Sequence, residues 1–208
     1  MTKKVSIIDY GVGNIFSVSN AIKAIGSEPC FVSTFEEVQK SQILILPGVG
    51  AFPSAIQKLE ALQLVEPIRE YANSGKKLIG ICLGMQLFFT SSEEMGLFKG
   101  LDLISGTIKE NPSTKDKDHL LPKTNIGWQK LDWRQDMGFH NLKKNSYYYF
   151  VHSFSAIPEL SKNTLATIKY GNVQLTAAVK KENIIGFQFH PERSGESGLK
   201  LLNTAINL

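Results

Sequence analysis

The sequence predicts an α/β protein of three layers, in which a mostly parallel sheet lies between two layers of helices and antiparallel strands are added in the second half. In the first half, short apolar runs alternate with amphipathic segments. These runs are apolar at nearly every position, which is typical of parallel strands buried on both faces. In the second half, strand-like segments follow one another with few helices between them, which favours antiparallel pairing.

In the first half, each expected strand is a short apolar run and each expected helix has a start or stop signal. Gly26 is placed to end the first helix, and Thr34 with Glu37 three residues later forms a capping box that opens the second. The turn 47–50, Pro-Gly-Val-Gly, stops the third strand. The expected strands are 5–9, 29–32, 43–46 and 78–81, and the expected helices are 15–25, one beginning at 34, 53–62 and 67–72.

The second half is expected to be mainly strands with one closing helix. Alternating apolar residues and β-branched or aromatic residues mark the strands, and an apolar periodicity near the C-terminus marks the helix. The polar, proline-flanked stretch 111–123 is expected to be a surface loop. The expected strands are 103–109, 147–152, 164–170, 176–180 and 184–189, and the expected helix is 198–207.

Length and composition favour one domain over residues 1–208 and exclude several classes of protein. The chain is 42% hydrophobic and carries a net charge of only +4, with Lys and Arg scattered rather than gathered in a basic stripe, so we expect no nucleic-acid binding. We also expect no membrane span or signal peptide, since apolar runs are well short of the ~20 residues needed to cross a bilayer. Two cysteines are too few for a disulfide framework, so we expect the cytoplasm.

Cys82 stands in the pattern Gly80-Ile81-Cys82-Leu83-Gly84, between a buried strand and the start of a helix. This is the cysteine counterpart of the nucleophile elbow, whose tight turn needs small residues and exposes the central side chain at the carboxyl end of the sheet. A helix N-terminus behind the sulfur favours the reactive thiolate. The alternative is a small buried hydrophobic residue, the usual role of a free cysteine. Cys30, in a strand-like run without glycines, is expected in the core.

A cysteine nucleophile requires a base, and His190 is the best candidate among four histidines. It ends the apolar run 184–189 and is followed by Pro191 and Glu192, so a fixed turn holds the imidazole and an acid is near to orient it. Taken alone, His190 also fits a structural role at a strand end. His119 and His140 lie in polar segments and are expected to face solvent.

The motifs GICLGMQ at 80–86 and GFQFHPE at 186–192 resemble those of the class I glutamine amidotransferases, which have a Cys-His-Glu triad and a flavodoxin-like sheet. Further segments resemble one subfamily, the glutaminase subunit of imidazole glycerol phosphate synthase, and the similarity runs from the first strand to the last helix. These segments are DYGVGNIFSV at 9–18, LPGVGAF at 46–52, IGW at 126–128 and YYYFVHSF at 147–154.

The resemblance implies that Cys82, His190 and Glu192 hydrolyse L-glutamine to L-glutamate and ammonia through a thioester, with no cofactor and no metal. It assigns the oxyanion hole to the backbone N–H groups of Val49 and Leu83. Substrate contacts are implied for the following residues: Gly48, Gly50, Gln86, His152, Ser153 and Phe154. From the residues alone, the glycine loop reads as a simple turn, Gln86 as a surface helix residue and 152–154 as a plain strand end.

The resemblance also implies a partner, a (β/α)8-barrel cyclase subunit that receives the ammonia in a heterodimer and makes imidazole glycerol phosphate and AICAR in histidine biosynthesis. The implied docking residues are Asn14, Trp128, Tyr149 and Arg193. Gly11-Val12-Gly13 is not a dinucleotide fingerprint, because Phe16 occupies the position of its third glycine. The resemblance implies instead that the segment 9–14 faces the partner protein.

Three departures from the family pattern fall near this docking face. Asn125-Ile126 replaces the usual His or Gln followed by Met, Gln129 replaces Asn, and Arg193 replaces Lys; the loop 111–123 is also long. They leave open a paralogous glutaminase that serves an N-sugar amidotransferase in surface-polysaccharide synthesis. A non-catalytic scaffold of the same fold and a related cysteine peptidase or chaperone are the rival hypotheses from further classes of protein.

Overall fold

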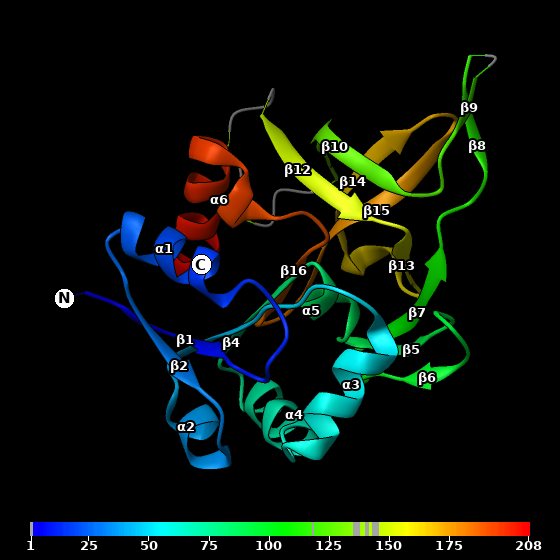
Figure 1. The fold of residues 1–208 in the computed structure, drawn as a ribbon. Coiled ribbons are helices and arrows are strands. Elements are labelled where there is room, and N and C mark those ends of the chain that lie inside the picture. The colour runs from blue at the N-terminus through cyan, green and yellow to red at the C-terminus, as the bar shows by residue number, and fades with distance from the viewer. Residues whose placement is uncertain (1, 118, 135–137, 140–141, 143–145) are drawn as a thin grey trace.

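The centre of the molecule is an eight-stranded sheet with the order β11-β14-β15-β16-β4-β3-β1-β2 (Figure 1). The computed structural model describes residues 2–117, 119–134, 138–139, 142 and 146–208. Strands from β2 to β16 pair in parallel, and strands from β16 to β11 pair antiparallel. The strands are β1 Lys4–Ile8, β2 Glu28–Val32, β3 Ile43–Leu46, β4 Lys77–Ile81, β11 Asp132–Trp133, β14 Thr164–Tyr170, β15 Val173–Lys181 and β16 Ile184–Phe187.

Helices cover both faces of this sheet, so its strands are buried on both sides. Two apolar clusters result, one beneath α1 and α6 and the other beneath α2, α3 and α4 (Figure 1). In β3, Leu44, Ile45 and Leu46 are fully buried; each such side chain contributes about 1.5–3 kcal/mol. The helices are α1 Ile15–Ala24, α2 Phe35–Lys40, α3 Phe52–Ala61, α4 Val65–Asn73, α5 Leu83–Gln86 and α6 Gly195–Asn207.

These elements confirm the predicted fold class and its local signals. The Thr34 side chain accepts from the Glu37 N–H and the Glu37 carboxylate accepts from the Thr34 N–H, so the capping box is formed. Gly26 ends the first helix with φ +78°, a conformation in which glycine is not strained. The C-terminal helix begins at Gly195, three residues before its expected start, directly after the turn that carries His190.

Two smaller sheets pack at the carboxyl end of the central sheet and were only partly predicted. One has the order β13-β7-β5-β6, and the other is an antiparallel ribbon of β10 and β12 (Figure 1). The ribbon packs against β14 and against the turn that follows β16. The strands are β5 Phe89–Ser92, β6 Phe98–Lys99, β7 Ile104–Glu110, β13 Phe154–Pro158, β10 Asn125–Lys130 and β12 Tyr147–His152.

The stretch 111–123 was predicted to be a surface loop. It contains instead a hairpin of β8 Thr114–Asp116 and β9 His119–Leu121. Hydrogen bonds anchor it alongside one apolar contact: buried Asn111 donates to the carbonyls of Lys123 and His152, Thr114 donates to that of Tyr170, and Leu121 packs against the core. Polar anchors of this kind leave no hydrophobic alternation in the sequence, which is why the strands were missed.

The expected environments of Cys30 and the two surface histidines have different outcomes. Cys30 lies on the edge strand β2 and is only partly buried, with its sulfur 3.4 Å from the Ser6 hydroxyl, because an edge strand lacks a neighbour on one side. His119 faces solvent as expected. His140 lies outside the described residues.

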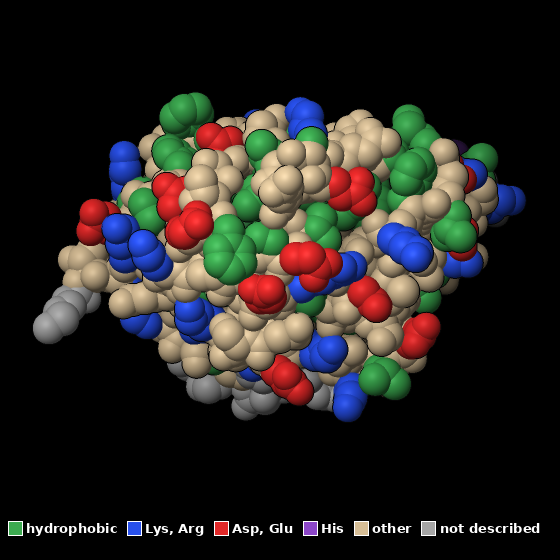
Figure 2. All heavy atoms as spheres, turned by 90° about the horizontal axis from the view of Figure 1, so that it is seen from below, with side chains coloured by type: hydrophobic (Ala, Val, Ile, Leu, Met, Phe, Trp, Pro, Cys, Tyr) green, Lys and Arg blue, Asp and Glu red, His purple; other side chains and the backbone are tan. Residues whose placement is uncertain are grey.

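The surface view agrees with an ordinary charged exterior. On the face shown in Figure 2, basic and acidic side chains are interspersed rather than segregated. Among the described residues, no helix is both long and apolar enough to cross a membrane.

Candidate active site

Cys82 occupies a strained turn between β4 and α5. Its φ of +54° and ψ of −111° lie outside the regions that residues other than glycine normally adopt. The flanking glycines are required by space: a Cβ at Gly84 would come within 1.8 Å of the Leu46 carbonyl oxygen, and one at Gly80 within 2.5 Å of the Phe88 ring. The Cys82 N–H donates to the Phe187 carbonyl at 2.7 Å. The predicted nucleophile elbow is therefore present.

The helix behind Cys82 is short. α5 has four residues and ends at Gln86. A single turn aligns few peptide dipoles, so helix polarity favours the thiolate less than the sequence interpretation assumed. The main electrostatic partner of Cys82 must be a side chain.

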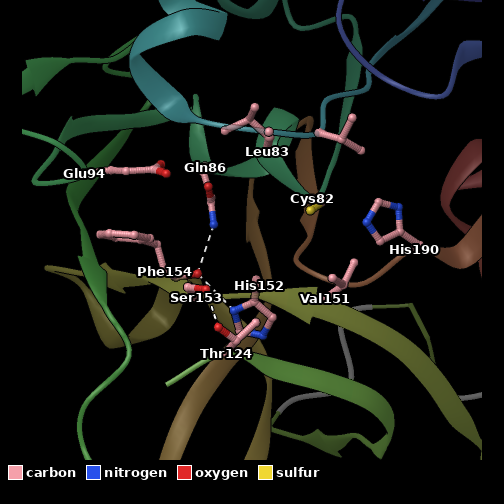
Figure 3. A pocket seen from close by; sticks show the side chains of 12 residues that line it. Cys82, Leu83, Gln86, Glu94, Thr124, Val151, His152, Ser153, Phe154 and His190 are labelled. Atoms are coloured by element: carbon pink, nitrogen blue, oxygen red, sulfur yellow. Dashed lines mark hydrogen bonds between the residues drawn. The ribbon is translucent and has the colours of Figure 1, made fainter. Parts of the chain in front are cut away.

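His190 is that side chain, and it is tightly held. Figure 3 shows its imidazole facing the sulfur of Cys82 across the mouth of the elbow. Its Nδ1 lies 2.7 Å from Oε1 of Glu192, and both side chains are almost completely buried. Since a carboxylate can only accept, Nδ1 carries a proton, which leaves Nε2 toward Cys82. That Nε2 is buried and hydrogen-bonds to none of the described residues.

The electrostatics of the site favour a charged imidazole. Burial lowers the pKa of His190, but its interactions with Cys82 and Glu192 outweigh burial and raise the pKa to about 10. A protonated His190 beside Cys82 stabilises the thiolate form of the sulfur. A thiol, an imidazole and a carboxylate thus lie together, the three groups that a cysteine nucleophile with a base and an orienting acid requires.

Backbone hydrogen bonds fix His190 to the ribbon. Its N–H donates to the Tyr149 carbonyl at 2.9 Å, and its carbonyl accepts from the Ser194 hydroxyl at 2.7 Å. The same hydroxyl accepts from the Tyr149 N–H at 2.9 Å. The position of the base therefore depends on β12, one of the two ribbon strands.

The glycine loop after β3 packs against the elbow. A Cβ at Gly48 would come within 2.9 Å of the Leu83 Cβ and 2.8 Å of the Tyr10 hydroxyl, so only glycine permits this approach. The Tyr10 hydroxyl donates to the Pro47 carbonyl at 2.8 Å and anchors the loop. The N–H groups of Val49 and Leu83 consequently belong to segments that meet beside Cys82.

A cavity of about 320 Å³ opens at this point (Figure 3). It is lined by side chains from the elbow, the glycine loop, the ribbon and the segment after β5. Glu94 is the one carboxylate among the described residues of this lining, and its Oε2 accepts from the Phe52 N–H at 2.9 Å. The lining residues are Val49, Gly50, Cys82, Leu83, Gln86, Glu94, Thr124, Val151, His152, Ser153, Phe154 and His190.

A neutral histidine lines the cavity. Burial lowers the pKa of His152 to about 4 despite its hydrogen bond to the Phe154 carbonyl, and nearby His190 lowers it further. Its Nδ1 lies 2.9 Å from that carbonyl oxygen and its Nε2 lies 3.0 Å from Nδ2 of Asn125. Both ring nitrogens of His152 thus have partners within the protein.

The structure brings most of the predicted site residues together. Cys82, His190, Val49, Leu83, Gly50, Gln86 and 152–154 line one cavity, while Gly48 and Glu192 stand directly behind it. Of the predicted docking residues, Trp128 and Tyr149 are in edge contact at 5.9 Å, and the guanidinium of Arg193 lies 5.4 Å from the Tyr149 ring. Asn14 is the N-cap of α1 and accepts from the Ser17 N–H, and α1 itself packs near the turn Pro191–Arg193.

Sequence reasoning missed several residues that build the site. Glu94 gave no signal beyond one charge in a polar turn, and Val151 and Thr124 read as ordinary residues. Gln188 and Asn125 were visible as polar residues at the end of an apolar run and at the start of the IGW segment. Both are fully buried, and a buried amide needs hydrogen-bond partners, which was the available clue.

The fold and this site define the class of protein. The chain belongs to the family described as glutamine amidotransferase class-I, which matches residues 6–207. Within that class it is 42% identical to "Imidazole glycerol phosphate synthase subunit HisH 1" of Legionella pneumophila strain Paris, over 98% of this chain and 99% of that one. It is 43% identical to "Imidazole glycerol phosphate synthase subunit HisH" of Methanosarcina barkeri strain Fusaro, over 99% of both. These findings confirm the resemblance carried by the motifs.

Solved structures of the same fold agree. "Structure of PurLQS from Thermotoga maritima" superimposes with a TM-score of 0.72 at 24% identity, covering 100% of this chain and 99% of that one. "Crystal structure of glutamine amidotransferase" gives a TM-score of 0.73 at 17% identity, with 96% of both chains covered. At these identities the similarity is one of fold.

Proposed function

We propose that residues 1–208 form a single glutaminase domain in which Cys82, His190 and Glu192 hydrolyse L-glutamine to L-glutamate and ammonia. The observation that carries the proposal is the triad geometry: a strained elbow presents Cys82 to His190, whose Nδ1 is bonded to buried Glu192. The family assignment supplies the substrate class, since its members are named for glutamine.

The chemistry proceeds in two halves. The Cys82 thiolate attacks the side-chain amide carbon, and the oxyanion that forms accepts hydrogen bonds from the N–H groups of Val49 and Leu83. Collapse breaks the C–N bond while Nε2 of His190 gives its proton to the leaving nitrogen, so ammonia departs and a γ-glutamyl thioester remains. Water then attacks the thioester, His190 takes a proton from it, and the thiolate leaves with glutamate as the product.

The cavity offers complementary groups for the rest of glutamine. Glu94 is placed to pair with the α-ammonium group, since it is the carboxylate in the lining. The backbone of 152–154 faces the cavity and receives the amino-acid end. The nitrogen of Gln86 is committed to the Phe154 carbonyl and to Gln188, so its side-chain oxygen is the atom that remains for a substrate N–H.

The exposed face of the ribbon supports a docking role. Ile126 and Trp128 of β10 and Val151 of β12 are exposed by 63%, 54% and 39%, and Tyr149 with Arg193 continues the same surface. Val151 also lines the cavity, so this apolar surface begins at the active site. Aromatic residues beside an arginine are typical of interface anchors. The relatives are named as subunits, and we assign this surface to a (β/α)8-barrel cyclase that receives the ammonia in histidine biosynthesis.

Both cysteines are free thiols, as a cysteine enzyme of the cytoplasm requires, and we propose that compartment. The test of the function is release of glutamate from glutamine by the purified chain with the cyclase subunit present. Cys82→Ala should abolish release and Cys30→Ala should retain it, because Cys30 lies on β2, outside the cavity. Release by Cys82→Ala at the unmodified rate would reject the proposal.

A further inference from the structure

One backbone carbonyl determines the orientation of a buried hydrogen-bond network beside the nucleophile. The Phe154 carbonyl oxygen lies 3.0 Å from Nε2 of Gln86 and 2.9 Å from Nδ1 of His152. A carbonyl oxygen can only accept, so both neighbours must present an N–H to it. Figure 3 shows these two side chains converging on Phe154 from opposite sides.

Toward the elbow, this constraint fixes the orientation of Gln188. Nε2 of Gln86 also donates to Oε1 of Gln188 at 3.1 Å. Because Gln86 presents its NH2 group there, Gln188 must present its oxygen, and its own NH2 group then faces the Cys82 sulfur at 3.9 Å. A flipped Gln188 would set two NH2 groups against each other. Gln188 is also fully buried, with its N–H bonded to the Ala177 carbonyl, so it has no solvent partner to turn to.

Away from the elbow, the same donor–acceptor constraint extends through His152 to the ribbon. With its proton on Nδ1, His152 offers Nε2 as an acceptor, so Asn125 must present Nδ2, which lies 3.0 Å away. The Asn125 oxygen then accepts from Nε2 of Gln129 at 3.1 Å. Every amide in the network therefore has one consistent orientation, from β10 to Cys82.

We propose that Gln188 is a positioning residue for the nucleophile: its side-chain amide donates a hydrogen bond to the Cys82 sulfur, and the Phe154 carbonyl holds that amide in the donating orientation through Gln86. The inference rests on the proposed role of Cys82 as nucleophile. An N–H directed at sulfur stabilises a thiolate more than a thiol, because hydrogen bonds to charged groups are the stronger ones. The distance is long for such a bond, so the effect is smaller than that of His190.

Other titratable groups near Cys82 are retained in the Gln188 variants. They are His190 across the elbow, Tyr10 beneath the glycine loop, and Glu94 and His152 in the cavity wall. Burial and the nearby Cys82 raise the pKa of Tyr10, so its hydroxyl stays neutral. If replacing Gln188 changes the pH dependence of Cys82 alkylation, the change is therefore due to loss of the Gln188 amide.

The experiment measures the rate of Cys82 alkylation by iodoacetamide against pH, without glutamine, by peptide mass mapping that separates Cys82 from Cys30. In Gln188→Leu the midpoint of the profile should move upward by about 0.5–1 pH unit, so alkylation below the midpoint slows about 3- to 10-fold. Gln188→Glu keeps the shape and adds charge, so it should move the midpoint further. For glutamine, kcat should fall while KM changes little.

The matched control is Gln39→Leu, which removes the same amide from α2, where it donates to the Pro67 carbonyl. Its profile should superimpose on that of the unmodified chain. If the Gln188→Leu profile also superimposes on that of the unmodified chain, the inference is overturned. If Gln188→Leu shows no cooperative unfolding transition, the Gln188→Glu profile is compared instead. In the unmodified chain, the Gln188 side-chain NH2 signals in NMR should shift when Cys82 is alkylated, and unmoved signals would also overturn it. Absence of glutaminase activity in the unmodified chain with the cyclase subunit present would instead reject the proposed function.

Discussion

Glu192 binds His190 through a 2.7 Å contact between Oε1 and Nδ1, and the two residues are separated along the chain by one proline. The short 3-10 turn Pro191–Arg193 brings the carboxylate back under the imidazole. Glu192 thus fixes the tautomer and orientation of the base without touching the cavity. The two residues should therefore differ in their contributions to turnover.

Removing His190 should nearly eliminate glutaminase turnover, whereas removing Glu192 should reduce it less. We expect His190→Ala to lower kcat by about 10²–10⁴-fold, the usual contribution of a general acid–base group. Glu192→Gln should retain more activity and should move the basic limb of the pH–rate profile to lower pH, since Glu192 is one of the groups that raise the pKa of His190. Steady-state kinetics across pH measures both effects. An unmoved limb in Glu192→Gln would contradict this arrangement.

A glutamine-like electrophile, such as a diazo-ketone analogue, should label Cys82 and spare Cys30. Cys82 lines the cavity beside His190, whereas Cys30 lies partly buried on β2 next to Ser6. Peptide mass mapping after labelling gives the ratio of the two products, and excess glutamine should protect Cys82 alone. Equal modification of the two cysteines would show that the elbow confers no special reactivity.

The parallel part of the fold and the triad were predictable because their signals are local. Strands such as β3 are apolar on both faces, and the glycines around Cys82 mark a turn that only they permit. The hairpin of β8 and β9 was not predictable, because buried Asn111 and Thr114 hold it through hydrogen bonds to distant residues.

The same physical cause explains which site residues were missed. Gln188 contacts Cys82, 106 residues away in the chain, and Asn125 contacts His152, 27 residues away, and these contacts exist only after folding. Glu94 enters the cavity because the sheet β13-β7-β5-β6 places the end of β5 there. Pairings of that kind leave no trace in local periodicity.

Acid should destabilise the fold through His152. Its pKa is about 4 in the folded chain, against an ordinary value of 6.5, so the unfolded chain binds a proton first as pH falls. This stabilising contribution is complete above pH 6.5 and is lost as pH falls toward 4. Between about pH 7 and pH 4.5, the free energy of unfolding should fall about 2–3 kcal/mol more in the unmodified chain than in His152→Gln. Urea titrations at several pH values measure the free energy of unfolding of both chains. An equal dependence of that free energy on pH would contradict the prediction.

Trp128 should matter for association more than for basal turnover. Trp128→Ala should weaken binding of the cyclase subunit by about 2 kcal/mol, or roughly 30-fold in Kd, because exposed aromatic anchors carry much of an interface's energy. Phe35→Ala is the matched control: Phe35 is a comparably exposed aromatic residue on α2. Calorimetric titration gives both affinities. A large loss of basal glutaminase activity with unchanged affinity would instead place Trp128 in the catalytic machinery.

The isolated chain should hydrolyse glutamine weakly and gain activity when the cyclase subunit and its acceptor ligand are added. Both His190 and the docking surface depend on β12, so a partner bound there can favour the conformation in which the oxyanion hole is complete. Equal turnover by the chain alone and by the complex would refute this coupling while leaving the triad intact.

The central claim is that Cys82 carries the γ-glutamyl group during turnover. The most direct measurement is rapid acid quenching of the chain with radiolabelled glutamine and the cyclase subunit, followed by mapping of the label. We expect a hydroxylamine-sensitive label on the peptide that contains Cys82, present in Cys30→Ala, absent in Cys82→Ala, and more abundant when hydrolysis is slowed in Glu192→Gln. Steady glutamate release by Cys82→Ala, or label on any other residue in the unmodified chain, would contradict it.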